Sequence, residues 1–140
     1  LGFVLDDISD NLPGAFLIYK ADKTDDHILF ANQELIRFAG CQDLTDFLNF
    51  CNHSFRNLVR PDEYDQVEES IWRQIDSQSD GSNDYVTFHF ARKDGTYREV
   101  LDHGRIMESR HYGRLFYVLF VEREMLREHY ENGASVVNAE

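Results

Sequence analysis

The sequence predicts a single α+β domain built on a five-stranded antiparallel sheet. The first observation is size: the chain has 140 residues, of which 42% are hydrophobic and 14% aromatic. That is one domain's length, with enough apolar material for a core. The second observation is periodicity. Apolar residues alternate or run together near both ends of the chain, whereas in a central block they recur every three or four positions. Strands on either side of a helical block are typical of an α+β fold.

Five segments have the apolar pattern of strands, and they lie at 15–20, 27–31, 85–91, 96–107 and 115–121. A polar turn joins the first two, and the Asp94-Gly95 dipeptide is a strong hairpin signal between the third and fourth. The last segment is apolar on both faces. We therefore expect it in the middle of the sheet, covered on both sides.

Three helices are predicted between the second and third strands. Asn32 can cap the first helix, and Gly40 ends it. The second is short, with Leu44, Phe47 and Leu48 at helical spacing. The third begins at Pro61, and its buried stripe is predicted to be Tyr64, Val67, Ile71 and Ile75. These three helices are expected to cover one face of the sheet.

Both ends of the chain are predicted to lie outside the sheet domain, which spans residues 13–122. Residues 1–12 have the pattern of an amphipathic helix, with aspartates opposite an apolar stripe of Val4, Ile8 and Leu12. Residues 123–140 are predicted to be a charged linker helix followed by a loose tail. We expect the terminal helices to cover the second face of the sheet. The absence of an initiating Met suggests a fragment of a longer protein.

Charge and cysteine content argue against several classes of partner. Fourteen basic and 26 acidic residues give a net charge of −12, which disfavours binding to nucleic acid or to an anionic membrane surface. No apolar run approaches the roughly 20 residues that span a bilayer, and the start of the chain has no signal-peptide pattern. Cys41 and Cys51 form no metal or redox motif, which fits a reducing cytoplasm.

The sequence contains no recognisable catalytic motif. No spaced pair of carboxylates stands in an otherwise apolar stretch, and the six histidines are too scattered for a metal site. His89 and His103 lie on consecutive predicted strands and could meet on one face, where they would contact a ligand. We favour the alternative that they are surface imidazoles on a half-exposed sheet.

Several short motifs, taken in order, resemble the PAS domain family. They are Ala31-Asn32-Gln33, Phe38-Ala39-Gly40-Cys41, Arg60-Pro61-Asp62-Glu63, Arg92-Lys93-Asp94-Gly95-Thr96-Tyr97-Arg98 and Asp102-His103-Gly104-Arg105. The combination is especially similar to PAS modules that precede diguanylate cyclase (GGDEF) domains in bacterial signalling proteins. Two departures stand out: Arg60 replaces a frequent histidine, and Val121-Glu122-Arg123 replaces a frequent Asp-Ile-Thr.

The resemblance raises the question of a cofactor. Flavin photosensors of the family need a cysteine in an Asn-Cys-Arg-Phe-like helix, whereas Cys51 is followed by Asn52-His53-Ser54-Phe55. Haem sensors commonly use a histidine on the long helix, and residues 61–76 contain none. We therefore expect neither flavin nor haem, and we interpret Cys51 as a buried apolar residue. The resemblance leaves open an unknown small molecule as ligand.

The residues expected to enclose such a ligand lie between the helices and one sheet face. They are Ile18, Phe30, Phe38, Phe47, Phe55, Ile71, Phe88 and Tyr117. Bulky aromatic side chains of this kind can leave a cavity or can fill the core completely.

The resemblance implies a non-catalytic, cytoplasmic sensor domain that relays a small-molecule or partner signal to a linked output domain, with a diguanylate cyclase as the expected output. We expect a homodimer whose interface combines Val4, Ile8 and Leu12 with the outer face of the last strand. The alternative is a dimerisation module that binds no ligand.

Overall fold

The computed structural model describes residues 14–78 and 83–124. Within them a five-stranded antiparallel sheet has the order β2-β1-β5-β4-β3. The strands are β1 (Ala15–Lys20), β2 (Ile28–Ala31), β3 (Asn83–Ala91), β4 (Tyr97–Ser109) and β5 (Gly113–Glu122). The predicted fold class, strand count and pairing are therefore confirmed. β5 is the central strand, as its apolar sequence predicts.

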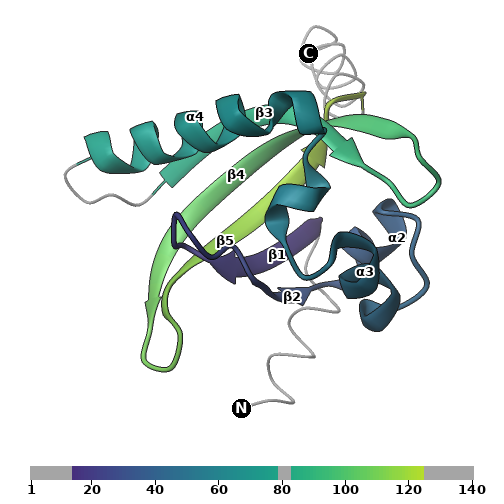
Figure 1. The fold of residues 1–140 in the computed structure, drawn as a ribbon, viewed down its shortest axis with the longest axis horizontal. Helices are drawn as coiled ribbons and strands as arrows, with labels where there is room; N and C mark the ends of the chain where they lie inside the picture. The colour runs from purple at the N-terminus through teal and green to yellow at the C-terminus, as the bar shows by residue number, and fades with distance from the viewer. Residues whose placement is uncertain (1–13, 79–82, 125–140) are drawn as a thin grey trace, which may run out of the picture.

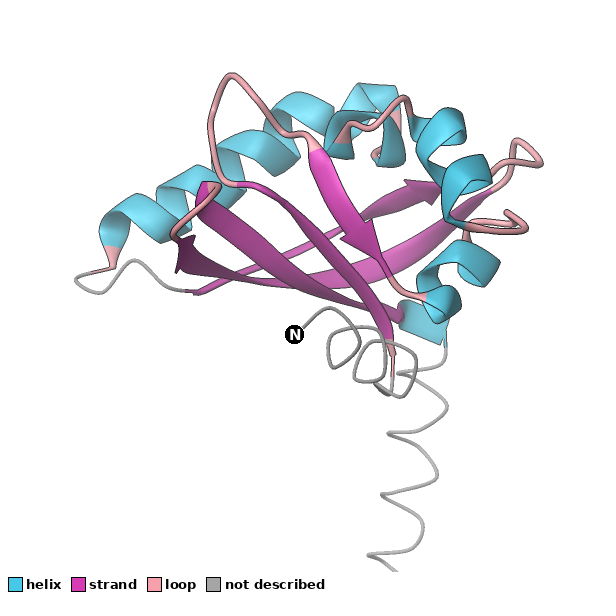
Figure 2. Ribbon diagram, turned by 90° about the horizontal axis from the view of Figure 1, so that it is seen from below, coloured by secondary structure: helices cyan, strands magenta, loops and turns pink. Residues whose placement is uncertain are grey.

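The helices lie between β2 and β3 in the sequence and along one face of the sheet (Figure 1, Figure 2). They are α2 (Gln33–Phe38), α3 (Leu44–Cys51), two short 3₁₀ helices, η1 (Phe55–Leu58) and η2 (Pro61–Glu63), and α4 (Tyr64–Ser77). Figure 1 shows α4 over the β3 side of the sheet and α2 and α3 near β2. None of the helices in the described ranges is long and apolar enough to cross a membrane.

The start of α2 is fixed by the buried side chain of Asn32. Its Oδ1 accepts hydrogen bonds from the backbone N–H of Leu35 at 3.1 Å and of Phe16 at 2.9 Å, and its Nδ2 donates to the carbonyl of Gly14 at 2.8 Å. The residue thus caps the helix and joins it to β1. The predicted cap is confirmed.

The long helix divides into two parts. Pro61 opens η2, because proline is suited to a first helical position, and α4 follows directly from Tyr64. The side chains of Val67, Ile71 and Ile75 are buried against the sheet, together with Trp72. This is the apolar stripe that the sequence predicts, apart from a half-buried Tyr64.

Candidate functional site

The inner face of the sheet, which the helices cover, carries two acidic residues among its apolar side chains. On β3 the positions that share this face begin with Asp84 and continue through Val86 to Phe88. On β4 they include Asp102 and Gly104. In the antiparallel register, Asp84 lies opposite Gly104, and Asp102 lies between Val86 on β3 and Phe120 on β5. The two carboxyl groups are therefore diagonal neighbours.

Both carboxyl groups are enclosed. Each of the two residues is 1% exposed, and Oδ1 and Oδ2 of Asp84 and Oδ2 of Asp102 have no hydrogen-bond partner among the residues that the structure describes. The glycine at 104 is part of the arrangement, since a Cβ there would lie 2.6 Å from Oδ2 of Asp84. The Asp84 carboxyl thus occupies the space that a side chain at position 104 would fill.

Burial changes the acidity of this pair. Desolvation raises the pKa of Asp84 to about 7, and it raises the pKa of Asp102 well above its usual range, with the Asp84 charge adding to the effect. No ion pair within 14–78 and 83–124 involves either residue. In the absence of a cation, protonation is the way to neutralise such a pair.

A further acidic group, Tyr19, interacts with the pair. Tyr19 of β1 is buried, and its pKa is raised well above the usual range, first by burial and then by the charges of Asp102 and Asp84. The Tyr19 ring stacks on Phe55 with a centroid distance of 4.4 Å. Glu68 of α4 also acts on Tyr19, and burial raises the pKa of Glu68 too. The group that interacts with Asp84 and Asp102 is therefore a third acid and not a base.

α4 is attached to the edge of the sheet by one side chain. Oε1 of Gln74 accepts a hydrogen bond from the backbone N–H of Tyr85 at 2.9 Å, and Nε2 of the same amide donates to the Tyr85 carbonyl at 2.9 Å. Tyr85 adjoins Asp84 on β3. These two hydrogen bonds between Gln74 and the Tyr85 backbone, called the Gln74 clasp below, therefore hold α4 next to the acidic pair.

Five of the eight predicted pocket residues contribute to the core on the inner face. Phe47, Phe55, Ile71 and Phe88 are buried there, and Phe38 packs against the same cluster. The Phe38 ring meets Phe90 edge-on at 5.2 Å. The structure thus brings together these predicted residues, which come from α2, α3, η1, α4 and β3.

For Ile18, Phe30 and Tyr117 the prediction of a place in the pocket is wrong, because all three lie on the outer face. Ile18 pairs with Phe30 and with Tyr117, so the three share one row across β2, β1 and β5. Their neighbours on β1, Leu17 and Tyr19, take the inward positions instead. β1 and β5 are apolar on both faces, and the pattern therefore left their orientation open.

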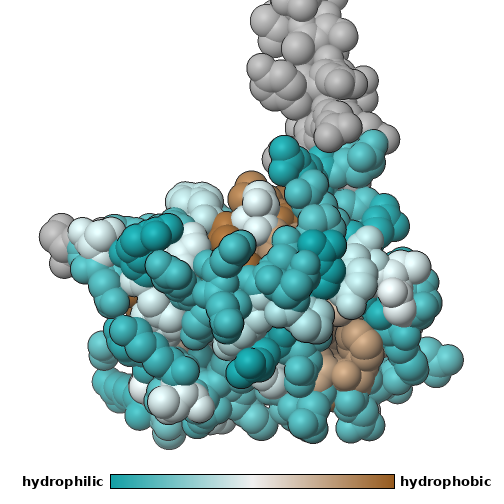
Figure 3. Space-filling view, turned by 45° about the horizontal axis from the view of Figure 1, so that its top comes forward, coloured by the Kyte–Doolittle hydropathy of each residue, from teal (hydrophilic) through white to brown (hydrophobic). Residues whose placement is uncertain are grey.

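The outer face carries an exposed apolar strip on β5. Tyr117, Leu119 and Val121 alternate along the strand, and they are 39%, 39% and 40% exposed. Thus in the described part of the chain this face of the central strand is not fully covered, contrary to the expectation from its sequence. The surface drawn in Figure 3 is mainly hydrophilic, with small hydrophobic areas. The predicted dimer residues Val4, Ile8 and Leu12 lie outside the described residues.

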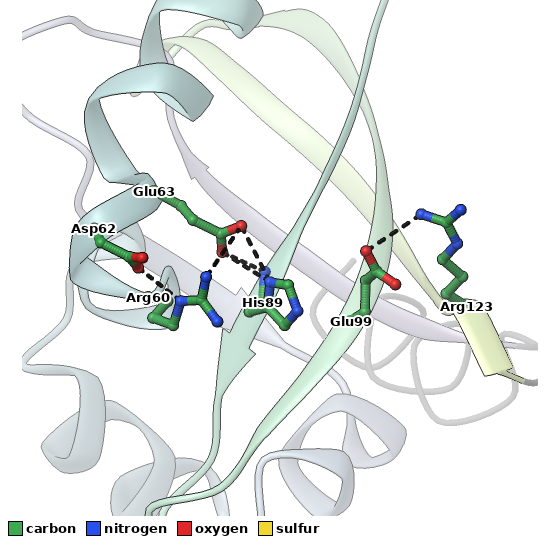
Figure 4. A network of polar contacts seen from close by, with 6 residues as sticks. All are labelled: Arg60, Asp62, Glu63, His89, Glu99 and Arg123. Atoms are coloured by element: carbon green, nitrogen blue, oxygen red, sulfur yellow. Dashed lines mark hydrogen bonds and ion pairs between the residues drawn. The ribbon is translucent and has the colours of Figure 1, made fainter.

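His89 and His103 do not meet. His89 pairs with Glu99 across β3 and β4, whereas His103 pairs with Tyr85 and stacks on its ring at 4.3 Å. Glu63 of η2 accepts from the His89 backbone N–H at 2.8 Å, and its carboxylate lies 3.1 Å from Nδ1 of the same histidine (Figure 4). These contacts cover the free edge of β3, which gives His89 a structural role.

The two cysteines are enclosed. Cys51 ends α3 with no exposed surface, and burial raises the pKa of its thiol to about 11. Cys41 is also buried, and desolvation raises its pKa. Thiols of this kind are poor nucleophiles and poor metal ligands. In the described part of the chain, no three potential ligands among histidine, cysteine and acidic residues cluster around a metal position.

A separate open groove of about 480 Å³ lies between η1, α4 and the β3–β4 hairpin. Two of its basic side chains are already engaged: Lys93 pairs with Asp46 at 2.6 Å, and Arg92 donates from Nε to the Phe38 carbonyl at 2.7 Å. The groove therefore offers no free cation to an anionic ligand from these two side chains.

The sequence by itself does not predict the acidic pair. Its pattern places Asp84 in the polar loop before the strand, whereas β3 begins at Asn83. The signal was the parity of Asp84 with Val86 and Phe88, which places all three side chains on one face of an extended chain. No spaced pair of carboxylates stands in an apolar stretch of the sequence, and the pair forms across two strands instead.

Comparison with known proteins gives a consistent result. Residues 28–121 match the family model described as PAS fold. No curated protein matches the sequence. Many solved structures do, and three are representative. The PAS domain of an HTR-like protein from Haloarcula marismortui is 16% identical, with 86% of this chain and 90% of that chain covered and a TM-score of 0.63.

The other two have similar scores. A PAS domain from a two-component sensor histidine kinase is 12% identical, with coverage of 87% and 96% and a TM-score of 0.64. A LOV protein from Rhodobacter sphaeroides is 17% identical, with coverage of 85% and 64% and a TM-score of 0.64. At these identities the likeness shows the fold alone.

Proposed function

Because this chain belongs to the PAS family, we propose that it is a regulatory sensor domain that relays a small-molecule or partner signal to an output domain. The family generally consists of non-catalytic sensor domains. The observation that carries the proposal is the family match over residues 28–121, on a chain whose core holds carboxyl groups without protein partners. A core that accommodates unpaired polar groups is suited to a ligand that supplies the missing contacts.

The proposed output is a diguanylate cyclase linked after β5. Its support is the motif set that resembles PAS modules ahead of GGDEF domains. The end of β5 is tied to the start of β4 by two ion pairs, Arg98 with Glu122 and Arg123 with Glu99, the latter at 3.2 Å (Figure 4). These pairs stand where the family often has Asp-Ile-Thr. We expect them to transmit strain from the sheet to the following segment.

An activity assay of the full-length protein tests this output. The protein should convert GTP to the cyclic dinucleotide, and Arg123→Ala should alter the rate of this conversion while the domain stays folded. A full-length protein that forms no cyclic dinucleotide would refute the cyclase, and the sensor role would then need another output.

The proposed assembly is a homodimer through the outer face. The exposed strip of Tyr117, Leu119 and Val121 supplies apolar surface of the kind that proteins use for association. We propose that Val4 and Ile8, together with Leu12, extend this surface. Sedimentation of Leu119→Glu should show monomers, whereas Gln66→Glu, which adds the same charge at an exposed site on α4, should remain dimeric. A dimeric Leu119→Glu variant would rule out this interface.

The alternative is a dimerisation module that binds no ligand. The closed interior favours it, since the unpartnered oxygens of Asp84 and Asp102 have no contact with solvent. Native mass spectrometry of freshly purified protein separates the two functions. A dimer that retains no small molecule and shows no thermal shift with a metabolite panel supports the module. Visible absorbance would instead reveal flavin or haem, which we do not expect.

A further inference from the structure

The acidic pair on β3 and β4 is a part of the interior whose polar atoms the described residues do not satisfy with hydrogen bonds. Asp84 and Asp102 are each 1% exposed, and three of their four carboxyl oxygens have no partner. Buried carboxyl groups normally occur with a cation or with a full set of hydrogen-bond donors. Within 14–78 and 83–124 no lysine, arginine or histidine forms an ion pair with them.

The surroundings define which ligand would satisfy the pair. Phe120 lies directly opposite Asp102, and the Phe88 ring meets Phe120 edge-on at 6.1 Å. The other titratable group that interacts with the pair, Tyr19 from β1, is acidic as well, and Glu68 from α4 in turn acts on Tyr19. Among the described residues no cation pairs with these carboxyl groups, and the donor next to them is the Tyr19 hydroxyl, while the site offers acceptors and aromatic walls.

We propose that Asp84 and Asp102 bind the amino, amidino or guanidino group of a small organic cation in the core between the sheet and α4. This inference rests on the proposed sensor function and names its ligand class. A group with several N–H donors can serve both carboxylates, and a planar fork can engage one of them through two parallel hydrogen bonds. The carbon part of the ligand then contacts the aromatic rings.

A divalent metal ion fits the same residues less well. Two carboxylates supply too few oxygen ligands for Ca²⁺, and Mg²⁺ would have to bring several waters into an interior that is closed to solvent. The described residues provide no third acidic, histidine or cysteine ligand at this position. An organic cation needs fewer protein ligands, because its own donors are fixed in direction.

Entry of the ligand requires movement of α4. The carboxyl oxygens are closed to solvent, and the Gln74 clasp holds α4 to the backbone of Tyr85 beside Asp84. We expect binding to displace α4 outward from β3. The ligand thus favours one of two packings of the same domain, which is the differential interaction that a sensor needs.

Binding should also release a proton. Burial keeps at least one carboxyl of the empty pair protonated up to about pH 7, and a cation binds the ionised form. Affinity should consequently rise about tenfold for each pH unit between 5 and 7, as long as the ligand stays positively charged.

The experiment uses a defined series of probes: methylammonium, guanidinium, benzamidine and 1,4-diaminobutane, with benzamide and benzoate as neutral and anionic matches of benzamidine. Titration calorimetry at pH 6 and pH 7 measures affinity, and two buffers of different ionisation enthalpy report proton release. In parallel, carbon NMR follows the carboxyl resonances of Asp84 and Asp102 in the wild-type protein.

At least one cation should bind, shift both carboxyl resonances and release a proton. Benzamide and benzoate should show none of these three effects. Asp84→Asn and Asp102→Asn should each weaken binding at least tenfold, and Glu108→Gln, at an exposed site of the same strand β4, should leave it unchanged. If no cation in the series moves the carboxyl resonances at millimolar concentration, the inference is wrong. The inference is also wrong if the cation still binds to both the Asp84→Asn and the Asp102→Asn variant as it does to the wild type.

The experiments distinguish failure of this inference from failure of the sensor function. If native mass spectra show a different, uncharged molecule, the cation proposal is wrong and the sensor function stands. If a cation binds to the pair but never alters the output of the full-length protein, the cation proposal stands and the sensor function is wrong.

Discussion

Replacing Asp84 with asparagine should make the stability of this domain less dependent on pH. The side chain is buried, and desolvation raises its pKa from an ordinary 3.8 to about 7. The folded state therefore holds a proton that the unfolded chain has already released over that range. Stability from this group is fully present below about pH 4 and is lost as the pH rises to about 7.

The magnitude follows from the size of the shift. About three pKa units at 1.36 kcal/mol each correspond to about 4 kcal/mol over the full range, with about 3 kcal/mol falling between pH 5 and pH 8. Water entry and relaxation around the ionised group would reduce this figure, so it is an upper value. Asparagine has nearly the same shape and no charge, and Asp84→Asn should avoid that loss.

Urea unfolding at pH 5 and pH 8, followed by circular dichroism, measures the effect. The wild-type protein should lose up to about 3 kcal/mol more than Asp84→Asn between the two pH values. Glu108→Gln controls for the change of net charge, since its side chain is exposed on the same strand as Asp102. If wild type and Asp84→Asn lose equal free energy of unfolding, the Asp84 carboxyl is ionised in the folded state throughout, and the argument for a neutral buried pair fails.

Three further predictions concern other parts of the core. Gly104→Ala should cost about 1–3 kcal/mol of stability, because its Cβ would lie 2.6 Å from Oδ2 of Asp84, and the cost should disappear in an Asp84→Ala background. Asn32→Ala should lower stability by about 2–4 kcal/mol in thermal unfolding, since it removes a helix cap and leaves the Phe16 N–H and Gly14 carbonyl without their partner. Iodoacetamide at pH 8 should label Cys51 only in unfolded protein, because a pKa of about 11 leaves roughly one thiol in a thousand ionised; rapid labelling of native protein would contradict this.

The elements of the fold could be predicted because their signals are local. Asn32 is a suitable cap, Pro61 opens a helix, and the switch between two-residue and helical periodicity marks the boundaries of the sheet. Antiparallel pairing followed from the order of the elements. The position of β5 in the centre followed from its unbroken apolar sequence.

The candidate site depends on information that is not local. β1 and β5 are apolar on both faces, so the sequence predicts a pocket position for Tyr117 and Ile18 although the register turns them outward. Asp84 and Asp102 are 18 residues apart in the sequence, and each by itself resembles an ordinary surface acid. Only the pairing of β3 with β4 makes them neighbours, beside a glycine that leaves room for one of the carboxyl groups.

Asp84 and Asp102 lie near α4 on one side and near the end of β5 on the other. Asp102 is two residues from Val100, which pairs with Glu122 at the exit of β5, and Asp84 adjoins the Tyr85 backbone that holds α4. A ligand that pushes α4 from the acidic pair therefore acts on β3, and β3 is joined along its whole length to β4 and so to the end of β5. A coupling of this kind needs no chain of special side chains, because continuous strand pairing is already rigid. Such coupling requires that the free energies of the empty and the occupied packing differ by little. An acidic pair can make this difference small, because its burial is costly in the empty domain and a bound cation neutralises it.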